Sequence, residues 1–229
     1  TDMDTTKTDY PFTVEASPDY AFLNVTIPGG KTLRVEAEAM AAMDTSITMK
    51  TKMKGGFKRM LSGEKLFIND YTAGVEDAYI GLAPATPGDI AHLYLENETV
   101  FVQNGSFLAS GPEIQSGIEF QGFKGFFSGE KLFMIRNSGT GDLWFNTYGG
   151  LIEIDVKDRY VVDTGYIVAF TDSLTYDVRP VGGMKSFFFS KEGLVCRFSG
   201  EGKVWIQTRL APAFVKWADA FRKVESKKT

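Results

Sequence analysis

Hydrophobic and polar residues alternate with a period of two along several parts of the chain. In residues 151–157, aliphatic side chains alternate with charged ones, so that Ile152, Ile154 and Val156 would share one face of a strand. Residues 32–39 show the same alternation, with apolar positions set against arginine and glutamate. This pattern predicts strands with one face towards a hydrophobic core and the other towards solvent.

Glycine-rich segments separate the strand-like parts. Residues 138–141 and 199–202 both read Ser-Gly-x-Gly between hydrophobic runs, which is typical of hairpin loops. Another turn is predicted where Gly29 and Gly30 follow Pro28. Together, the alternation and the turns predict an all-β fold in a single domain covering the whole chain.

One segment near the C-terminus has the periodicity of a helix. Phe214, Trp217 and Phe221 recur at steps of three and four residues, and Pro212 stands near the first turn of a helix predicted over residues 212–226. We expect this amphipathic helix to cap the β-body or to pack on a neighbouring subunit. The alternative is a helix that lies on a membrane surface.

The chain also contains an internal repeat. Residues 56–67 and 122–133 are identical at nine of twelve positions, and both end in Ser-Gly-Glu-Lys-Leu-Phe. A looser third version begins at Gly183, and residues 138–147 match residues 199–208. Matches that recur in a fixed order indicate duplicated structural units.

We therefore divide the chain into three modules of about 60 to 66 residues, which span residues 12–81, 82–149 and 150–210. Each module is expected to contain a strand pair, a glycine turn, the repeated segment and a hairpin. In this alignment Tyr79 takes the place of Trp144 and Trp205, and both tryptophans are expected to be core anchors. Modules of this length are too long for solenoid coils and favour a pseudo-threefold arrangement of small sheets.

Composition agrees with a globular protein and limits its partners. Hydrophobic residues make up 43% of the chain and charged residues 24%, which allows a sizeable core. The formal net charge is −4, so the basic face of a nucleic-acid-binding protein is not expected. The densest basic cluster could contact phosphate or a lipid headgroup, but lysines also protect the edges of sheets, and we favour that interpretation. The cluster comprises Lys50, Lys52, Lys54, Lys58 and Arg59.

The cysteine content and the hydropathy predict a soluble, cytoplasmic protein. Cys196 is the single cysteine, so no intrachain disulfide can form, and its strand-like surroundings predict a small buried side chain. No apolar run approaches the roughly 18 residues of a membrane-spanning helix, and no signal-peptide pattern opens the sequence.

The single histidine limits metal and catalytic chemistry. A site built from several histidines cannot form, and a Ser-His-Asp triad would have to use His92. His92 shares a face of its predicted strand with Ile90, Tyr94 and Glu96, so we expect a partly exposed histidine without a role as ligand or base. Phosphate-binding glycine loops, Cys-x-x-Cys pairs and nucleophile elbows do not occur in the sequence. The sequence therefore predicts no catalytic residue, no metal site and no cofactor.

The repeated polar positions are the candidate interaction site. They are Lys58, Ser62, Glu64 and Lys65 in the first module and Lys124, Ser128, Glu130 and Lys131 in the second. On equivalent loops around a pseudo-threefold axis, they would form a ring for an anionic ligand or partner. The structural interpretation is favoured, because glycine and serine recur wherever a turn recurs and glutamate can pair with lysine across strands.

The repeated segment, residues 139–145 and residues 165–170 together resemble one family. It is the bacterial and archaeal group of unknown function whose mitochondrial relatives are called altered inheritance of mitochondria proteins. The resemblance covers roughly residues 12–210. It implies a fold of double-stranded β-helix type with three lobes, similar to the trp RNA-binding attenuation protein, and it implies oligomers. The third copy, at residues 190–193, departs from Ser-Gly-Glu, which weakens any role that needs three equal motifs.

These observations favour a non-enzymatic scaffold or interaction protein that self-associates as a trimer or a higher ring. Its partners would be copies of itself, another protein or a membrane surface. The alternative is a binding module for a small anionic ligand, a phospholipid headgroup or nucleic acid, with nucleic acid the least favoured of the three.

Overall fold

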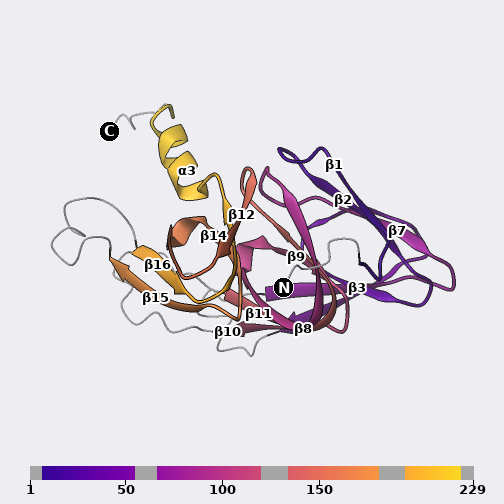
Figure 1. Ribbon diagram of the computed structural model, residues 1–229. Helices are drawn as coiled ribbons and strands as arrows, with labels where there is room; N and C mark the ends of the chain where they lie inside the picture. The colour runs from indigo at the N-terminus through magenta and orange to yellow at the C-terminus, as the bar shows by residue number, and fades with distance from the viewer. Residues whose placement is uncertain (1–6, 55–65, 120–133, 181–193, 223–229) are drawn as a thin grey trace.

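The computed structural model describes residues 7–54, 66–119, 134–180 and 194–222. The described chain is built almost entirely of antiparallel strands, with one short helix near the C-terminus (Figure 1). The prediction of an all-β fold with a C-terminal helix is therefore confirmed.

Three consecutive stretches of the chain supply the strands. The first stretch contains β1 (Phe12–Glu15), β2 (Phe22–Ile27), β3 (Thr32–Glu36), β4 (Met40–Met43), β5 (Thr48–Lys54), β6 (Leu66–Thr72) and β7 (Ala78–Leu82). The second contains β8 (Ile90–Gln103), the 3-10 turn η1 (Asn104–Ser106), β9 (Phe107–Ser110), β10 (Gln115–Glu119) and β11 (Met134–Asn146). The third contains β12 (Leu151–Val156), β13 (Arg159–Asp163), η2 (Thr164–Tyr166), β14 (Ile167–Thr171), β15 (Thr175–Pro180), β16 (Leu194–Ser199) and β17 (Gly202–Gln207).

The strands form three sheets. A four-stranded sheet has the order β1-β2-β7-β4, and a three-stranded sheet has the order β13-β16-β15. Between them lies a ten-stranded sheet with the order β12-β17-β14-β8-β11-β9-β3-β6-β5, with β10 paired to β11. Figure 1 places β1, β2 and β7 at one end of the molecule and β15 and β16 at the other, with β8 and β11 between them.

Alternation predicted the faces of β3 correctly and those of β12 only in part. On β3, Leu33 and Val35 are buried and their neighbours are half-buried. On β12, Val156 is buried as expected, but Ile152 is 46% exposed. Among the described strands β12 is the last of its sheet, so its side chains have a neighbouring strand on one side only.

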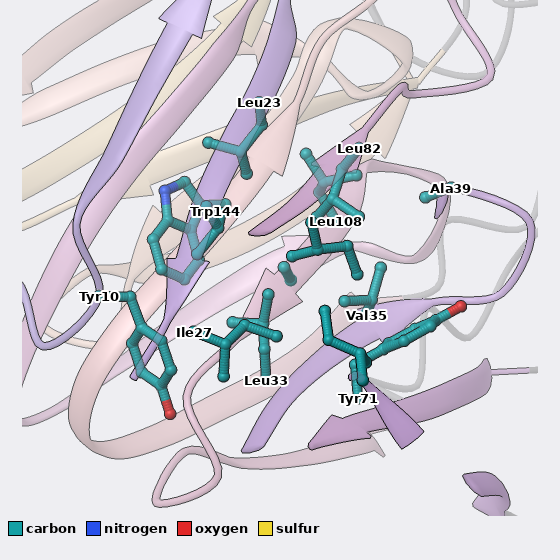
Figure 2. Packing of buried hydrophobic residues seen from close by; sticks show 14 of the residues in the cluster. Tyr10, Leu23, Ile27, Leu33, Val35, Ala39, Tyr71, Leu82, Leu108 and Trp144 are labelled. Carbon is teal, nitrogen blue, oxygen red and sulfur yellow. The ribbon is translucent and has the colours of Figure 1, made fainter. Parts of the chain in front are cut away.

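Three hydrophobic clusters form the core. The cluster in Figure 2 combines residues of the first stretch, such as Leu23 and Leu33, with Leu108 and Trp144 of the second. Trp144 and Trp205 are fully buried, as predicted for core anchors, and Cys196 is buried as well.

The same strand pairings occur in all three stretches. In the first stretch β2 pairs with β7. The equivalent pairing joins the first half of β8 to the second half of β11 in the second stretch, and β12 to β17 in the third. Likewise, β3 pairs with β6 in the first stretch. The equivalent pairing joins the second half of β8 to the first half of β11 in the second stretch, and β13 to β16 in the third. The short strands β4, β9 and β14 pair with β7, β11 and β17, and each contains a bulge at the same place. The residues skipped at the bulges are Ala41, Leu108 and Val168.

These registers correct one detail of the sequence alignment. Gly81, not Tyr79, takes the place of Trp144 and Trp205, because all three lie opposite the alanine that follows the bulge. A Cβ atom at Gly81 would lie 2.7 Å from the ring of Phe22 and 2.6 Å from the hydroxyl of Tyr79, so these two side chains fill the space. Two smaller aromatic residues there replace one tryptophan.

Pairings between stretches, which we call seams, join the stretches into one body. At the first seam β9 pairs with β3, and at the second seam β14 pairs with β8. The equivalent third pairing would join β4 to β13. Among the described residues, β4 pairs only with β7 and β13 pairs only with β16. Figure 1 shows β7 and β16 at opposite ends of the molecule.

The C-terminal helix α3 (Ala211–Asp219) is shorter than predicted. The expected end at residue 226 is wrong, because the amides of Phe221 and Arg222 donate to carbonyl groups three residues back, which ends the α-helical pattern. Phe214, Trp217 and Phe221 are exposed, and α3 has no buried residue. The helix therefore does not bury its apolar side on the β-body, although Phe214 contacts the ring of Tyr148. No helix among the described residues is long and apolar enough to cross a membrane.

Candidate functional site

The interaction loops predicted from the repeat lie outside the described residues. This applies to Lys58, Ser62, Glu64 and Lys65 in the segment 55–65 and to Lys124, Ser128, Glu130 and Lys131 in the segment 120–133. Their arrangement as a ring therefore stays a prediction.

A buried histidine–aspartate pair is the first candidate that the structure provides. His92 on β8 and Asp142 on β11 lie on paired strands, and Nε2 of His92 donates to Oδ1 of Asp142 at 2.6 Å. The His92 side chain is 6% exposed and that of Asp142 is fully buried. The backbone amide of Asp9 donates to the other oxygen of Asp142 at 2.9 Å, and the hydroxyl of Tyr94 donates to the carboxylate of Asp9.

Aromatic residues of the N-terminal segment and of β11 cover this pair. The ring centroids of Phe12 and Trp144 lie 4.5 Å and 5.0 Å from that of His92. Tyr10 packs edge-on against Trp144 and donates its hydroxyl proton to the carbonyl of Thr32 at 2.7 Å. Burial, reinforced by the nearby carboxylate of Asp142, raises the pKa of Tyr10, so this tyrosine stays neutral.

His92 is only partly exposed as a residue, as expected, but the sequence did not indicate that its side chain is enclosed and paired with Asp142. Residues 7–12 fold over the strand, and nothing in their sequence indicates that they end there. Asp142 could have been found only from the pairing register of β8 and β11, because the two residues are far apart in the chain.

The same position carries a polar pair in each stretch, which favours a structural role. The hydroxyl of Tyr79 donates to Asn24 at 2.7 Å at the equivalent place on β7 and β2. In the third stretch the equivalent residues, Lys203 on β17 and Glu153 on β12, form an ion pair. Three different chemistries thus bridge the same two strands at the same place, as expected for cross-strand stabilisation.

A hollow of about 620 Å³ lies beside the second seam. Its charged lining mixes four carboxylates with two lysines, and Thr171 and Gly202 lie at its wall. The charged residues are Glu98, Asp155, Asp172, Glu201, Lys157 and Lys203. Within the described parts of the chain, no three histidine, cysteine or acidic side chains come together in a way that could hold a metal ion.

A second hollow, of about 390 Å³, lies over the sheet of β13, β16 and β15. Arg159, Arg197 and Arg179 line it, together with Asp177, which pairs with Arg179. Arg159, Asp177 and Arg197 are exposed, so the outer face of this sheet carries an excess of positive charge. The sequence does not reveal this site, because one arginine comes from each of three strands that are separated along the chain.

The unpaired edges of β4 and β13 expose apolar side chains. Met43 on β4 is 38% exposed, and Val161 on β13 is 56% exposed. Their equivalents at the second seam, Phe170 and Phe101, are buried with ring centroids 5.1 Å apart. Positions that are buried in the core at the second seam are therefore exposed on the surface at these two edges.

One carboxyl group near β4 has a strongly shifted pKa. Glu36 ends β3 and is half-buried. Burial raises the pKa of Glu36 to about 7, and the neighbouring carboxylate of Glu38 adds to the rise.

Comparison with known proteins finds a matching family and two similar bacterial proteins. Residues 12–209 match the family described as mitochondrial biogenesis AIM24. An uncharacterised protein of Streptococcus pyogenes serotype M6 is 28% identical over 211 residues, which cover 86% of this chain and 85% of that protein. The crystal structure of another Streptococcus pyogenes protein is 25% identical, with a TM-score of 0.78 over 93% of this chain and all of that one.

Replacing the buried aspartate tests the structural role of the His92 pair. Asp142→Ala leaves the buried Nε2 of His92 and the amide of Asp9 without their acceptor, so we expect the free energy of unfolding to fall by about 2–3 kcal/mol. Denaturant unfolding measures this fall. Asp177→Ala removes an exposed ion pair and serves as a control that should leave the unfolding midpoint unchanged. Equal midpoints for the Asp142→Ala variant and the parent protein would contradict the structural role.

Glu36 should make the stability of the protein depend on pH. Its pKa rises from 4.5 to about 7 on folding, so the folded protein binds this proton more tightly than the unfolded chain. The free energy of unfolding should therefore fall as the pH rises from about 4.5 to about 7, by on the order of 2 kcal/mol. In Glu36→Gln this fall should be lost, while the exposed Glu15→Gln should keep it. Urea unfolding at several pH values measures both, and an unchanged pH profile in Glu36→Gln would show that Glu36 is not responsible.

Proposed function

The chain belongs to the AIM24 family, described as a mitochondrial biogenesis family, and from this premise we propose that it is a non-enzymatic scaffold that binds other copies of itself. The observation that carries the proposal is the pair of open strand edges. β4 and β13 each lack a second partner strand among the described residues, and both expose apolar side chains there. Unpaired backbone groups on an apolar edge favour pairing with another chain.

We also infer that the three stretches are copies of one module. The support is the recurrence of the same pairings and of the same bulge. The alanine after each bulge recurs too, as Ala42, Ala109 and Ala169. A body built from equal modules has equal edges, so an edge that is filled twice inside the chain is expected to be filled a third time by another chain.

The absence of an enzymatic role is part of the proposal. His92 and Asp142 are closed off by aromatic rings, and their position carries unrelated polar pairs in the other two stretches. Catalysis needs the reacting group of a substrate within hydrogen-bond reach of such a pair. The rings of Phe12 and Trp144 occupy that space.

Self-association should be visible as a mass larger than that of one chain. At micromolar concentration, light scattering coupled to gel filtration should give a multiple of 25.3 kDa, and dilution should lower it. The mass should not change with added salt alone, because the exposed edge residues Met43 and Val161 are apolar. A single species of 25.3 kDa at every concentration would overturn the scaffold proposal.

A second candidate function is the binding of anionic lipid headgroups. The arginine-lined face of β13, β16 and β15 supports it, since each basic side chain near an anionic surface contributes about 1 kcal/mol. Vesicles of phosphatidylcholine with phosphatidylserine should then sediment the protein at low ionic strength, and vesicles of phosphatidylcholine alone should not. A variant with alanine at Arg159, Arg179 and Arg197 should lose the binding, while the exposed Lys31→Ala should keep it. Equal sedimentation of both variants would exclude this face as the binding site.

A further inference from the structure

Both filled seams have the same register. At the first seam Val35 lies opposite Ala109 and Arg34 opposite Ser110, and at the second seam Val102 lies opposite Ala169 and Phe101 opposite Phe170. The valine and the alanine are fully buried at both seams. A buried valine opposite a buried alanine therefore marks the same register at both seams.

The open edges carry the same pair at the equivalent positions. Val162 on β13 lies opposite Cys196 on β16, as Val35 and Val102 lie opposite the equivalent residues of β6 and β11. Ala42 follows the bulge of β4, as Ala109 and Ala169 follow theirs. In the register of the filled seams, Ala42 would face Val162 and Met43 would face Val161.

Burial distinguishes the open edges from the filled seams. Ala42 is exposed although Ala109 and Ala169 are fully buried. Val161 is 56% exposed although its equivalent, Phe101, is buried. Within the part of the chain that the structure describes, β4 and β13 have no second partner strand to cover these positions.

Other edge strands do not give the same signal. β5, β10 and β15 occupy equivalent places, and each pairs with only one strand among the described residues. An edge that stays free in all three stretches is the normal border of the fold. By contrast, β9 and β14, the equivalents of β4, each have a second partner strand, and so do β3 and β8, the equivalents of β13. Among the described strands, only β4 and β13 lack that partner.

We propose that β4 of one copy pairs in antiparallel fashion with β13 of a second copy, with Ala42 opposite Val162 and Met43 opposite Val161. The proposal rests on the self-association proposed above and names the surface through which it occurs. The two edges lie on sheets at opposite ends of the molecule, so one copy cannot pair its own β4 with its own β13 (Figure 1). Each copy offers one edge of each kind, so the contact is head-to-tail and produces a ring or a filament.

Introduced cysteines test this register directly. Directly opposed residues of antiparallel strands have Cα atoms about 4.5–5.5 Å apart, which is within the range of a disulfide. The natural Cys196 is buried and its pKa is raised to about 12, so it does not compete as a thiolate at neutral pH. Met43→Cys and Val161→Cys are made in separate full-length chains, mixed and oxidised.

The expected result is a covalent dimer in the mixture and none in either variant alone. Met49→Cys, an exposed position on the border strand β5, replaces Met43→Cys in the control mixture, which should give no dimer. Dimers of Met43→Cys alone or of Val161→Cys alone would mean that like edges pair, and would overturn the proposal.

A charged substitution on the same edge gives a second readout. Val161→Lys changes an exposed side chain, so the single chain should fold as before while self-association weakens about tenfold or more. Ile152→Lys is the matched control, because Ile152 is 46% exposed on the edge strand β12, and it should keep the parent mass.

The two proposals fail in different ways. If the parent protein has an oligomeric mass but Val161→Lys keeps it and the mixed cysteine variants do not cross-link, self-association stands and this interface is wrong. If the parent protein is a monomer at all concentrations, the scaffold proposal falls and the interface falls with it.

Discussion

Hydrogen bonding along the strand edges is the constraint on which the rest of this structure depends. A strand edge presents a row of amide and carbonyl groups that must find partners, be protected or stay in water. Two seams satisfy this requirement inside the chain, and each buries a valine–alanine pair. Because the seams hold neighbouring stretches together, the hydrophobic clusters of the core contain residues of both. The cluster around Trp144 combines the first and second stretches, and the cluster around Phe170 combines the second and third.

The alternation of side chains predicted the all-β fold, whereas details that depend on the pairing register could not be read from the sequence. The strands, the C-terminal helix and the buried tryptophans followed from periodicity and residue type. The alignment of Tyr79 with Trp144 failed because an aromatic residue was matched to an aromatic residue. Pairing equates Gly81 with Trp144 instead, and two side chains from other positions fill the gap.

The candidate site shows why function was harder to predict than fold. The sequence identified polar residues that recur, and these lie outside the described residues. The polar pairs found on the strands recur in position but not in type, since an imidazole–carboxylate pair, a hydroxyl–amide pair and an ammonium–carboxylate pair occupy equivalent places. Repetition of a sequence motif indicates repeated geometry. When equivalent positions carry polar pairs of different chemical types, the contact between the strands matters more than any one chemical group.

The proposed head-to-tail contact follows from joining three stretches that have the same strand pairings into a linear chain. Three such stretches joined by two seams leave one complementary pair of edges among the described strands, that of β4 and β13. A third seam inside the chain would require the two end sheets to meet, but the filled seams fix those sheets at opposite ends (Figure 1). Strand edges with exposed apolar residues such as Met43 and Val161 can pair non-specifically unless one partner fits better than all others. The register used twice inside the chain supplies that partner, because the free edges repeat its valine and its alanine. The proposed scaffold would therefore grow by repeating an internal contact of the chain, and its growth would stop only where the rotation between copies closes a ring.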